Sequence, residues 1–210
     1  MNLTLPQQLY MVSHSAEKSR LDLRNSPVRG MLFRAAALAE LSTLGLLADQ
    51  QAKAVRNTDT PPPEDPFLGD VLSCVPPGET RLWVGAVHKD CTKAESFVRG
   101  QLTAAGRITP GRGGVLGMQQ QVTFSDPEEP RKLRERVRNP VLRAADPAEV
   151  PLEDAMMTVL LAEGGVGAVF TWQERREYRT ALKALAARFD AAAPGVRKAF
   201  AVAKAMRSTG

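Results

Sequence analysis

The chain has 210 residues, of which 43% are hydrophobic and 24% are charged, and its mean hydropathy is −0.22. This balance excludes an intrinsically disordered chain and an integral membrane protein, and a chain of this length can bury a core without disulfide staples. The 28 lysines and arginines outnumber the 23 aspartates and glutamates, and 20 of the 28 are arginines. Because arginine pairs with phosphate through two parallel hydrogen bonds, an anionic partner such as a lipid headgroup or nucleic acid is indicated.

The N-terminal part is predicted to form two helices. Thr4 and Gln7 have the spacing of a capping box and begin a helix that ends near Ser13. Ser26 and Pro27 begin a longer helix with apolar residues at helical spacing, which ends at Gly45.

The next segment is predicted to form a hairpin, a loop and two short helices. Residues 46–55 alternate as a short hairpin does, and the four prolines of residues 57–66 predict an exposed loop. Short helices are expected at 67–75 and 80–87, with Trp83 of the second in the core.

A helix followed by a hairpin is predicted in the middle of the chain. Apolar residues recur at helical spacing from Ala94 to Ala105, and Gly106 ends the helix. The glycine-rich turn of residues 110–114, followed by Val115 and Leu116, predicts a hairpin. Together they predict a winged-helix-like unit, a helix plus a wing.

The C-terminal half is predicted to be helical. A helix is expected over 126–143, with a kink or stop at Pro140, and another over 152–162. Thr171 begins a helix that continues to Phe189, and Pro194 introduces a closing helix. The fold class expected is therefore mainly α, a single helical domain over residues 1–210 with short β-hairpins.

No catalytic or metal-binding pattern is found in the sequence. His14 and His88 are its only histidines, and the spacing of His88 to Cys91 lacks the second pair of ligands that zinc needs. We expect no enzyme, no cofactor and no metal. The two cysteines and the absence of a signal-like segment predict reduced thiols in the cytoplasm.

Residues 131–138 contain five cations and one anion. Leu133, Val137 and Val141 form a stripe that can face the core, while the cations lie on either side of it and reach solvent. A charge-rich helix of this kind is often only a solvated face, and that interpretation stays open here.

Three blocks resemble one known family, and they occur in the family's order: 3–10 (LTLPQQLY), 24–40 (RNSPVRGMLFRAAALAE) and 102–116 followed by the basic helix. On these blocks the chain resembles the Golgi phosphoprotein 3 family, as a bacterial-type member, from Leu3 to about Met206. The resemblance implies a mostly helical peripheral membrane protein of the cytoplasm that binds phosphatidylinositol 4-phosphate. It leaves an adaptor role, a protein partner and self-association open.

The resemblance also implies site residues. Arg29 matches the family arginine that contacts the phosphate, with Val28 in place of a leucine, and the second basic cluster corresponds to Arg131, Lys132 and Arg134. Residues 164–172 match a loop that projects toward the bilayer. The residues expected to insert from that loop are Val166, Val169, Phe170 and Trp172. The alternative for these four is that they fill the core beneath a tight turn.

The sequence departs from the family in two respects. No aromatic residue lies between Tyr10 and Phe33, where eukaryotic members carry a tryptophan before the first arginine, so the choice of headgroup stays open. The arginine-rich segment that engages coat proteins has no counterpart here, so the coat-adaptor role is not transferred.

A winged-helix DNA-binding protein is the alternative function for the same features. Its helix over 92–105 would need cations, but it offers only Lys93 and Arg99 against Glu95, so nucleic acid is the less favoured partner.

Overall fold

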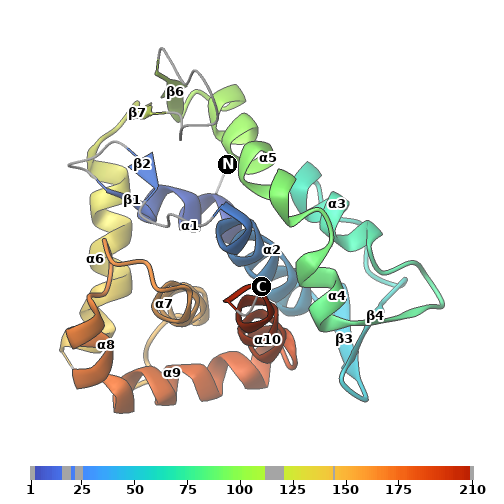
Figure 1. Cartoon of the computed structure of the whole chain (residues 1–210). Helices are drawn as coiled ribbons and strands as arrows, with labels where there is room; N and C mark the ends of the chain where they lie inside the picture. Colours follow the sequence, from blue (N-terminus) through green and yellow to red (C-terminus); the bar gives the residue numbers. More distant parts are fainter. Residues whose placement is uncertain (1–2, 16–19, 22–25, 112–120, 144, 209–210) are drawn as a thin grey trace.

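The computed structural model describes residues 3–15, 20–21, 26–111, 121–143 and 145–208. Within them the chain is mainly helical with short antiparallel strands, which confirms the predicted fold class (Figure 1). Among the helices so described, none combines the length and the apolar character needed to cross a bilayer.

The first helix, α1 (Leu5–Val12), begins where the sequence predicted. The Gln7 side chain accepts a hydrogen bond from the Thr4 backbone N–H at 3.2 Å, and the Glu40 carboxylate accepts one from the Leu5 N–H at 2.7 Å. Acceptors at this end suit the positive end of the helix dipole. After α1 the chain forms the small strand pair β1 (His14–Ser15) and β2 (Arg20–Leu21).

Helix α2 (Ser26–Thr43) is the centre of the fold (Figure 1). Helices α1, α5, α7 and α10 all pack against it, so it is buried on nearly every side. Gly45 follows it with φ +72°, a left-handed conformation that costs glycine little, and the helix ends at the predicted place.

The predicted hairpin becomes part of a three-stranded sheet. Strands β3 (Leu47–Gln50) and β4 (Lys53–Arg56) pair as expected, and β5 (Thr80–Leu82) adds to β4. The prediction of one helix over 80–87 is therefore wrong for its first three residues, because they pair with the edge of β4 and form a strand.

Two short helices flank that third strand. Helix α3 (Pro66–Ser73) begins at Asp65, whose carboxylate accepts from two backbone N–H groups at 2.9 Å, and α4 is Trp83–His88. Trp83 is buried, as predicted, and donates to Asp49 at 2.6 Å.

A helix and a hairpin follow in the predicted order. Helix α5 spans Cys91–Ala104, and β6 (Ile108–Pro110) pairs with β7 (Val122–Phe124). The return strand thus lies farther along the chain than the predicted residues Val115 and Leu116, which fall outside the described residues, as does most of the predicted turn.

Five helices complete the chain: α6 (Glu128–Leu142), α7 (Leu152–Gly164), α8 (Trp172–Glu177), α9 (Arg179–Ala192) and α10 (Val196–Ser208). Pro140 is accommodated in the last turn of α6. The helix predicted from Thr171 to Phe189 is broken at Tyr178 into α8 and α9, because α8 packs toward α6 while α9 runs along α7.

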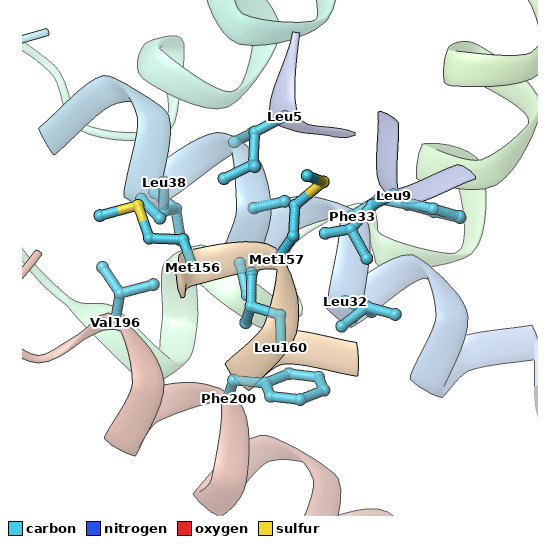
Figure 2. Close-up of a cluster of buried hydrophobic side chains, with 14 of the residues drawn as sticks. Leu5, Leu9, Leu32, Phe33, Leu38, Met156, Met157, Leu160, Val196 and Phe200 are labelled. Atoms are coloured by element: carbon cyan, nitrogen blue, oxygen red, sulfur yellow. The ribbon is translucent and has the colours of Figure 1, made fainter. Parts of the chain in front are cut away.

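The core lies where α1, α2, α7 and α10 meet (Figure 2). The large side chains labelled there are Leu5, Leu9, Leu32, Phe33, Leu38, Met156, Met157, Leu160, Val196 and Phe200. Helices α2 and α7 are apolar on nearly every side, and they form the centre against which α1 and α10 pack.

Candidate functional site

Arg29, the residue expected to contact a phosphate, lies in α2 with only 4% of its surface exposed. Its Nε and Nη2 atoms both donate to Glu95 Oε2 of α5, each at 2.8 Å. The expectation of an arginine turned toward solvent is therefore corrected. Arg29 is a buried cation, and a buried cation needs a partner such as this carboxylate.

Gly30 explains why Arg29 and Glu95 meet. A Cβ atom built on Gly30 would lie 1.6 Å from the backbone oxygen of Cys91, so α2 and α5 approach more closely here than any side chain permits. Glu95 lies one turn after Cys91 on α5, beside Arg29. The Val-Arg-Gly sequence is thus a helix-crossing motif as well as a source of positive charge.

Arg134 of α6 reaches the C-terminal end of α1. Its Nη2 atom donates to the backbone oxygen of His14 at 2.5 Å and lies 3.5 Å from that of Val12. A guanidinium is favourable there, because the last carbonyls of a helix lack partners and carry the negative end of its dipole.

Arg99 of α5 is the third cation at this place. Its Nη1 lies 3.8 Å from Glu95 Oε1, so Glu95 faces both Arg29 and Arg99. Burial raises the pKa of Tyr10 well above its usual value, and the charge and hydrogen bond of Arg99 act in the opposite direction. Arg99 therefore lies against α1 as well.

These three arginines lie near His14. The pKa of its imidazole is lowered from 6.5 to about 4, mainly by burial and further by the charges of Arg29, Arg134 and Arg99, while the hydrogen bond to Tyr10 acts in the opposite direction. The neutral ring is held by its Nδ1 contact with the Tyr10 carbonyl oxygen at 3.0 Å and packs edge-on against Phe124. We call Arg29, Arg99 and Arg134 the arginine cluster. It draws on α2, α5 and α6 around the end of α1 (Figure 1).

The other predicted members of the basic group stay on the surface of α6. Arg131 is exposed and pairs with Glu128 and, at 2.8 Å, with Glu135 of the same helix, and Lys132 is also exposed. Arg136 and Arg138 pair with carboxylates of other helices instead. Arg136 pairs with Asp154 of α7, and Arg138 pairs with Glu174 of α8 at 2.6 Å. Ion pairs with neighbouring carboxylates therefore neutralise much of the positive charge of this helix.

The loop after α7 does not expose the set predicted to insert into a bilayer. Val166, Val169 and Phe170 are completely buried, so the core interpretation is correct for these three. The turn is possible because Gly165 has φ +76°, and it is held by Arg138, which donates to the Val169 oxygen and lies 5.7 Å from the centre of the Phe170 ring.

Trp172 is the exception. As the first residue of α8 it has 65% of its surface exposed, with the guanidinium of Arg176 at 5.7 Å from its ring. Thr171 and Glu174 form the predicted capping box that starts α8 at this point and turns Trp172 outward.

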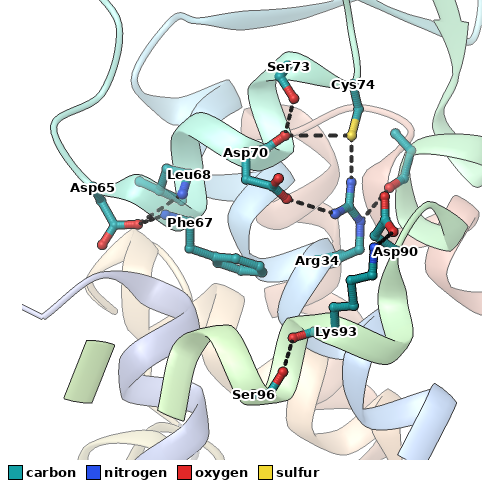
Figure 3. A network of polar contacts seen from close by, with 11 residues as sticks. Arg34, Asp65, Phe67, Leu68, Asp70, Ser73, Cys74, Asp90, Lys93 and Ser96 are labelled. Atoms are coloured by element: carbon teal, nitrogen blue, oxygen red, sulfur yellow. Dashed lines mark hydrogen bonds and ion pairs between the residues drawn. The ribbon is translucent and has the colours of Figure 1, made fainter. Parts of the chain in front are cut away.

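The sequence analysis missed a second buried arginine, Arg34, at the centre of a polar network (Figure 3). It donates to the Ala86 oxygen at 2.8 Å and to Cys74 Sγ at 2.9 Å, and it lies 3.7 Å from Asp70. A single arginine inside the apolar run from Met31 to Ala39 is a signal that could have indicated it. Arg34 ties α2 to α3 and α4. Across the described parts of the chain, no group of three metal-ligand side chains gathers.

Residues 5–203 match a protein family model described as Golgi phosphoprotein 3 (GPP34). The match covers nearly the whole chain and agrees with the resemblance found in the three sequence blocks. No curated protein sequence matches the chain at a significant level.

Proposed function

We propose, from the premise that the chain belongs to the Golgi phosphoprotein 3 family, that it is a non-enzymatic peripheral membrane protein of the cytoplasm that binds an anionic phospholipid headgroup. The arginine cluster is the proposed site, and phosphatidylinositol 4-phosphate is the headgroup that the family favours. The observation that supports this most is that Glu95 holds Arg29 and Arg99 beside α1, while Arg134 reaches the His14 oxygen at the end of α1.

The charge balance of the cluster suits a phosphate. Glu95 is the carboxylate that pairs with Arg29 and lies near Arg99, so it fixes their positions while neutralising only one positive charge. A phosphomonoester carries nearly two negative charges at pH 7 and offers several acceptor oxygens, which charged guanidinium donors bind strongly. The neutral His14 among these cations is consistent with a positive local potential.

Two exposed residues, on α6 and α8, are proposed to attract and anchor the protein. Lys132 is exposed on α6 and contributes about 1 kcal/mol when it approaches an anionic bilayer. Trp172 is the exposed aromatic residue we expect to contact the membrane interface, where indole rings are favoured. The buried residues of its loop are not part of this proposal.

Nucleic acid binding is less well supported. The two cations of α5, the helix that would enter a groove, already have carboxylate neighbours: Lys93 pairs with Asp90 at 2.8 Å, and Arg99 lies near Glu95. Two cations on this helix release few counterions from DNA, and that release drives most of the affinity.

The test is binding to vesicles of phosphatidylcholine alone or phosphatidylcholine doped with phosphatidylinositol 4-phosphate. We expect binding only to the doped vesicles, weakening as salt screens the charges. The Arg99→Gln and Arg134→Gln variants should each bind about tenfold more weakly, the loss expected for one charged hydrogen bond.

Arg81→Gln is the matched control, because Arg81 is an exposed arginine on β5, away from α1 (Figure 1). It should bind as the unmodified protein does. Equal binding to both kinds of vesicle, or equal losses in the control and the cluster variants, would contradict the proposal.

A further inference from the structure

A groove of about 490 Å³ lies between α7, α9 and α10, away from the arginine cluster. Its volume is in the range of pockets that hold small molecules. Its floor is apolar and includes Val159, Ala162, Leu182 and Ala186. Neither the sequence patterns nor the family match assigns a role to it.

The residues of α9 that line the groove differ in charge between its two ends. Arg179, Lys183, Ala186 and Asp190 lie on successive turns of one face, which extends for about 16 Å at 1.5 Å per residue. The cations lie toward the start of α9 and the carboxylate lies at its end.

The far end of the groove is closed by an ion-pair network. Arg197 of α10 donates to Asp190 and to Glu163 Oε1, each at 2.8 Å. Its positive charge is therefore matched by two carboxylates of the protein itself.

The near end has an excess of positive charge. Arg175, Arg179 and Lys183 line it, and within the described chain none of these three groove cations forms an ion pair with a carboxylate. Arg175 is held in place by its hydrogen bond to the Phe170 oxygen at 2.9 Å. Burial lowers the pKa of nearby Lys204, and the charge of Arg175 lowers it further, which is consistent with a positive local potential.

Glu163 belongs to the closed end of the groove. Its Oε1 atom is bound by Arg197, and its Oε2 atom is buried, so the carboxylate serves the ion-pair network and is not open to a ligand.

We propose that this groove binds a lysophospholipid, a ligand with one acyl chain and a phosphate. The acyl chain lies on the apolar floor, and the phosphate meets Arg179, Lys183 and Arg175. The phosphate matches a cluster of cations, and a single acyl chain matches the apolar floor beside them.

The experiment is calorimetric titration of the full chain with three monomeric probes of equal chain length: a lysophosphatidic acid, a fatty acid and a monoacylglycerol. We expect saturable binding of one lysophosphatidic acid per chain. The fatty acid has a carboxylate in place of the phosphate and the monoacylglycerol lacks the charge, so each should bind at least about tenfold more weakly.

Variants then locate the site. Arg179→Gln with Lys183→Gln should weaken lysophosphatidic acid binding at least about tenfold and leave monoacylglycerol binding unchanged. Lys198→Gln with Arg207→Gln is the matched control, since it removes two charges from exposed positions of α10 outside the groove lining.

Binding equal to the unmodified protein in the Arg179/Lys183 variant would overturn the proposal, as would an equal loss in the control or the absence of saturation below the micelle concentration. Tighter binding of the fatty acid would overturn the phosphate assignment. Vesicle binding through the arginine cluster is an independent measurement, so either proposal can fail alone.

Discussion

The arginine cluster and the groove cations contain the same kind of side chain in opposite settings. Arg29 is buried, paired with Glu95 and enclosed where α2 crosses α5, so most of its interactions stabilise the fold. Arg179 and Lys183 are exposed above an apolar floor and form no ion pair with the described carboxylates. The difference teaches that the contribution of a cation to the fold is not identified by its residue type or local sequence. It is identified by whether the protein supplies its counter-charge.

The largest effect expected is at Gly30. The Gly30→Ala variant should lose about 4 kcal/mol of unfolding free energy or fail to fold, because its Cβ would overlap the Cys91 backbone, which cannot move without separating two helices. Chemical denaturation measures this loss. Gly100→Ala in α5 is the control. It has open space around the new methyl group and should gain about 0.5–1 kcal/mol.

The next effect is at Glu95. Replacing it by glutamine leaves the Arg29 charge buried without its carboxylate, which should cost about 3 kcal/mol. The comparison is Glu135→Gln, which removes the exposed partner of Arg131 and should change the unfolding free energy by less than about 0.5 kcal/mol. Similar losses in the two variants would mean that the buried and surface pairs do not differ in kind.

The pH dependence of His14 should be of similar size. Its pKa is about 4 in the folded chain and 6.5 when unfolded, so the unfolded state binds more protons between these values. Stability from this residue is present above pH 6.5 and is lost as the pH falls toward 4, by about 3 kcal/mol. The His14→Phe variant should lack that loss in denaturation measured at a series of pH values.

Glu40 provides the opposite slope in the same experiment. Burial raises the pKa of this carboxyl from 4.5 to about 7, so the folded state binds the extra proton and stability falls as the pH rises between those values. The difference between each variant and the unmodified protein separates the two residues, and Glu40→Gln should remove the loss of stability between pH 4.5 and 7.

A parallel pH profile for His14→Phe and the unmodified protein would refute the assignment to His14.

The smallest effect is expected at the groove. Arg179→Gln with Lys183→Gln should change the unfolding free energy by no more than about 0.5 kcal/mol, because both side chains are exposed and contribute no ion pair among the described residues. Thermal unfolding with Lys198→Gln and Arg207→Gln as control checks this. A loss as large as that of Glu95→Gln would show that the groove cations stabilise the fold after all.

Local sequence patterns predicted most of the helices correctly because their signals are local. The Thr171–Glu174 cap, the Ser26–Pro27 start and the left-handed Gly45 are each contained within a few residues. The strand at 80–82 was missed because its partner, β4, is far away in sequence, and no local pattern shows an open sheet edge.

The candidate site was only partly predictable for the same reason. Arg29 was identified through the family motif, but its partner Glu95 is 66 residues away, and no spacing rule joins them. Arg99 was considered only as a cation of a DNA-binding helix, whereas the crossing of α2 and α5 brings it to α1. The apolar loop residues Val166 and Phe170 were ambiguous because membrane insertion and core packing select the same side chains.

The position of α10 has a consequence for synthesis of the chain. Val196 and Phe200 complete the core formed by α2 and α7 (Figure 2), although α2 leaves the ribosome long before α10 is made. Until then, the apolar surface that α10 covers on its neighbours is exposed to water and to other chains. During synthesis there is therefore an interval in which the residues of the central helix have been made but the helix that covers them has not. Aggregation through this apolar surface is favoured during that interval.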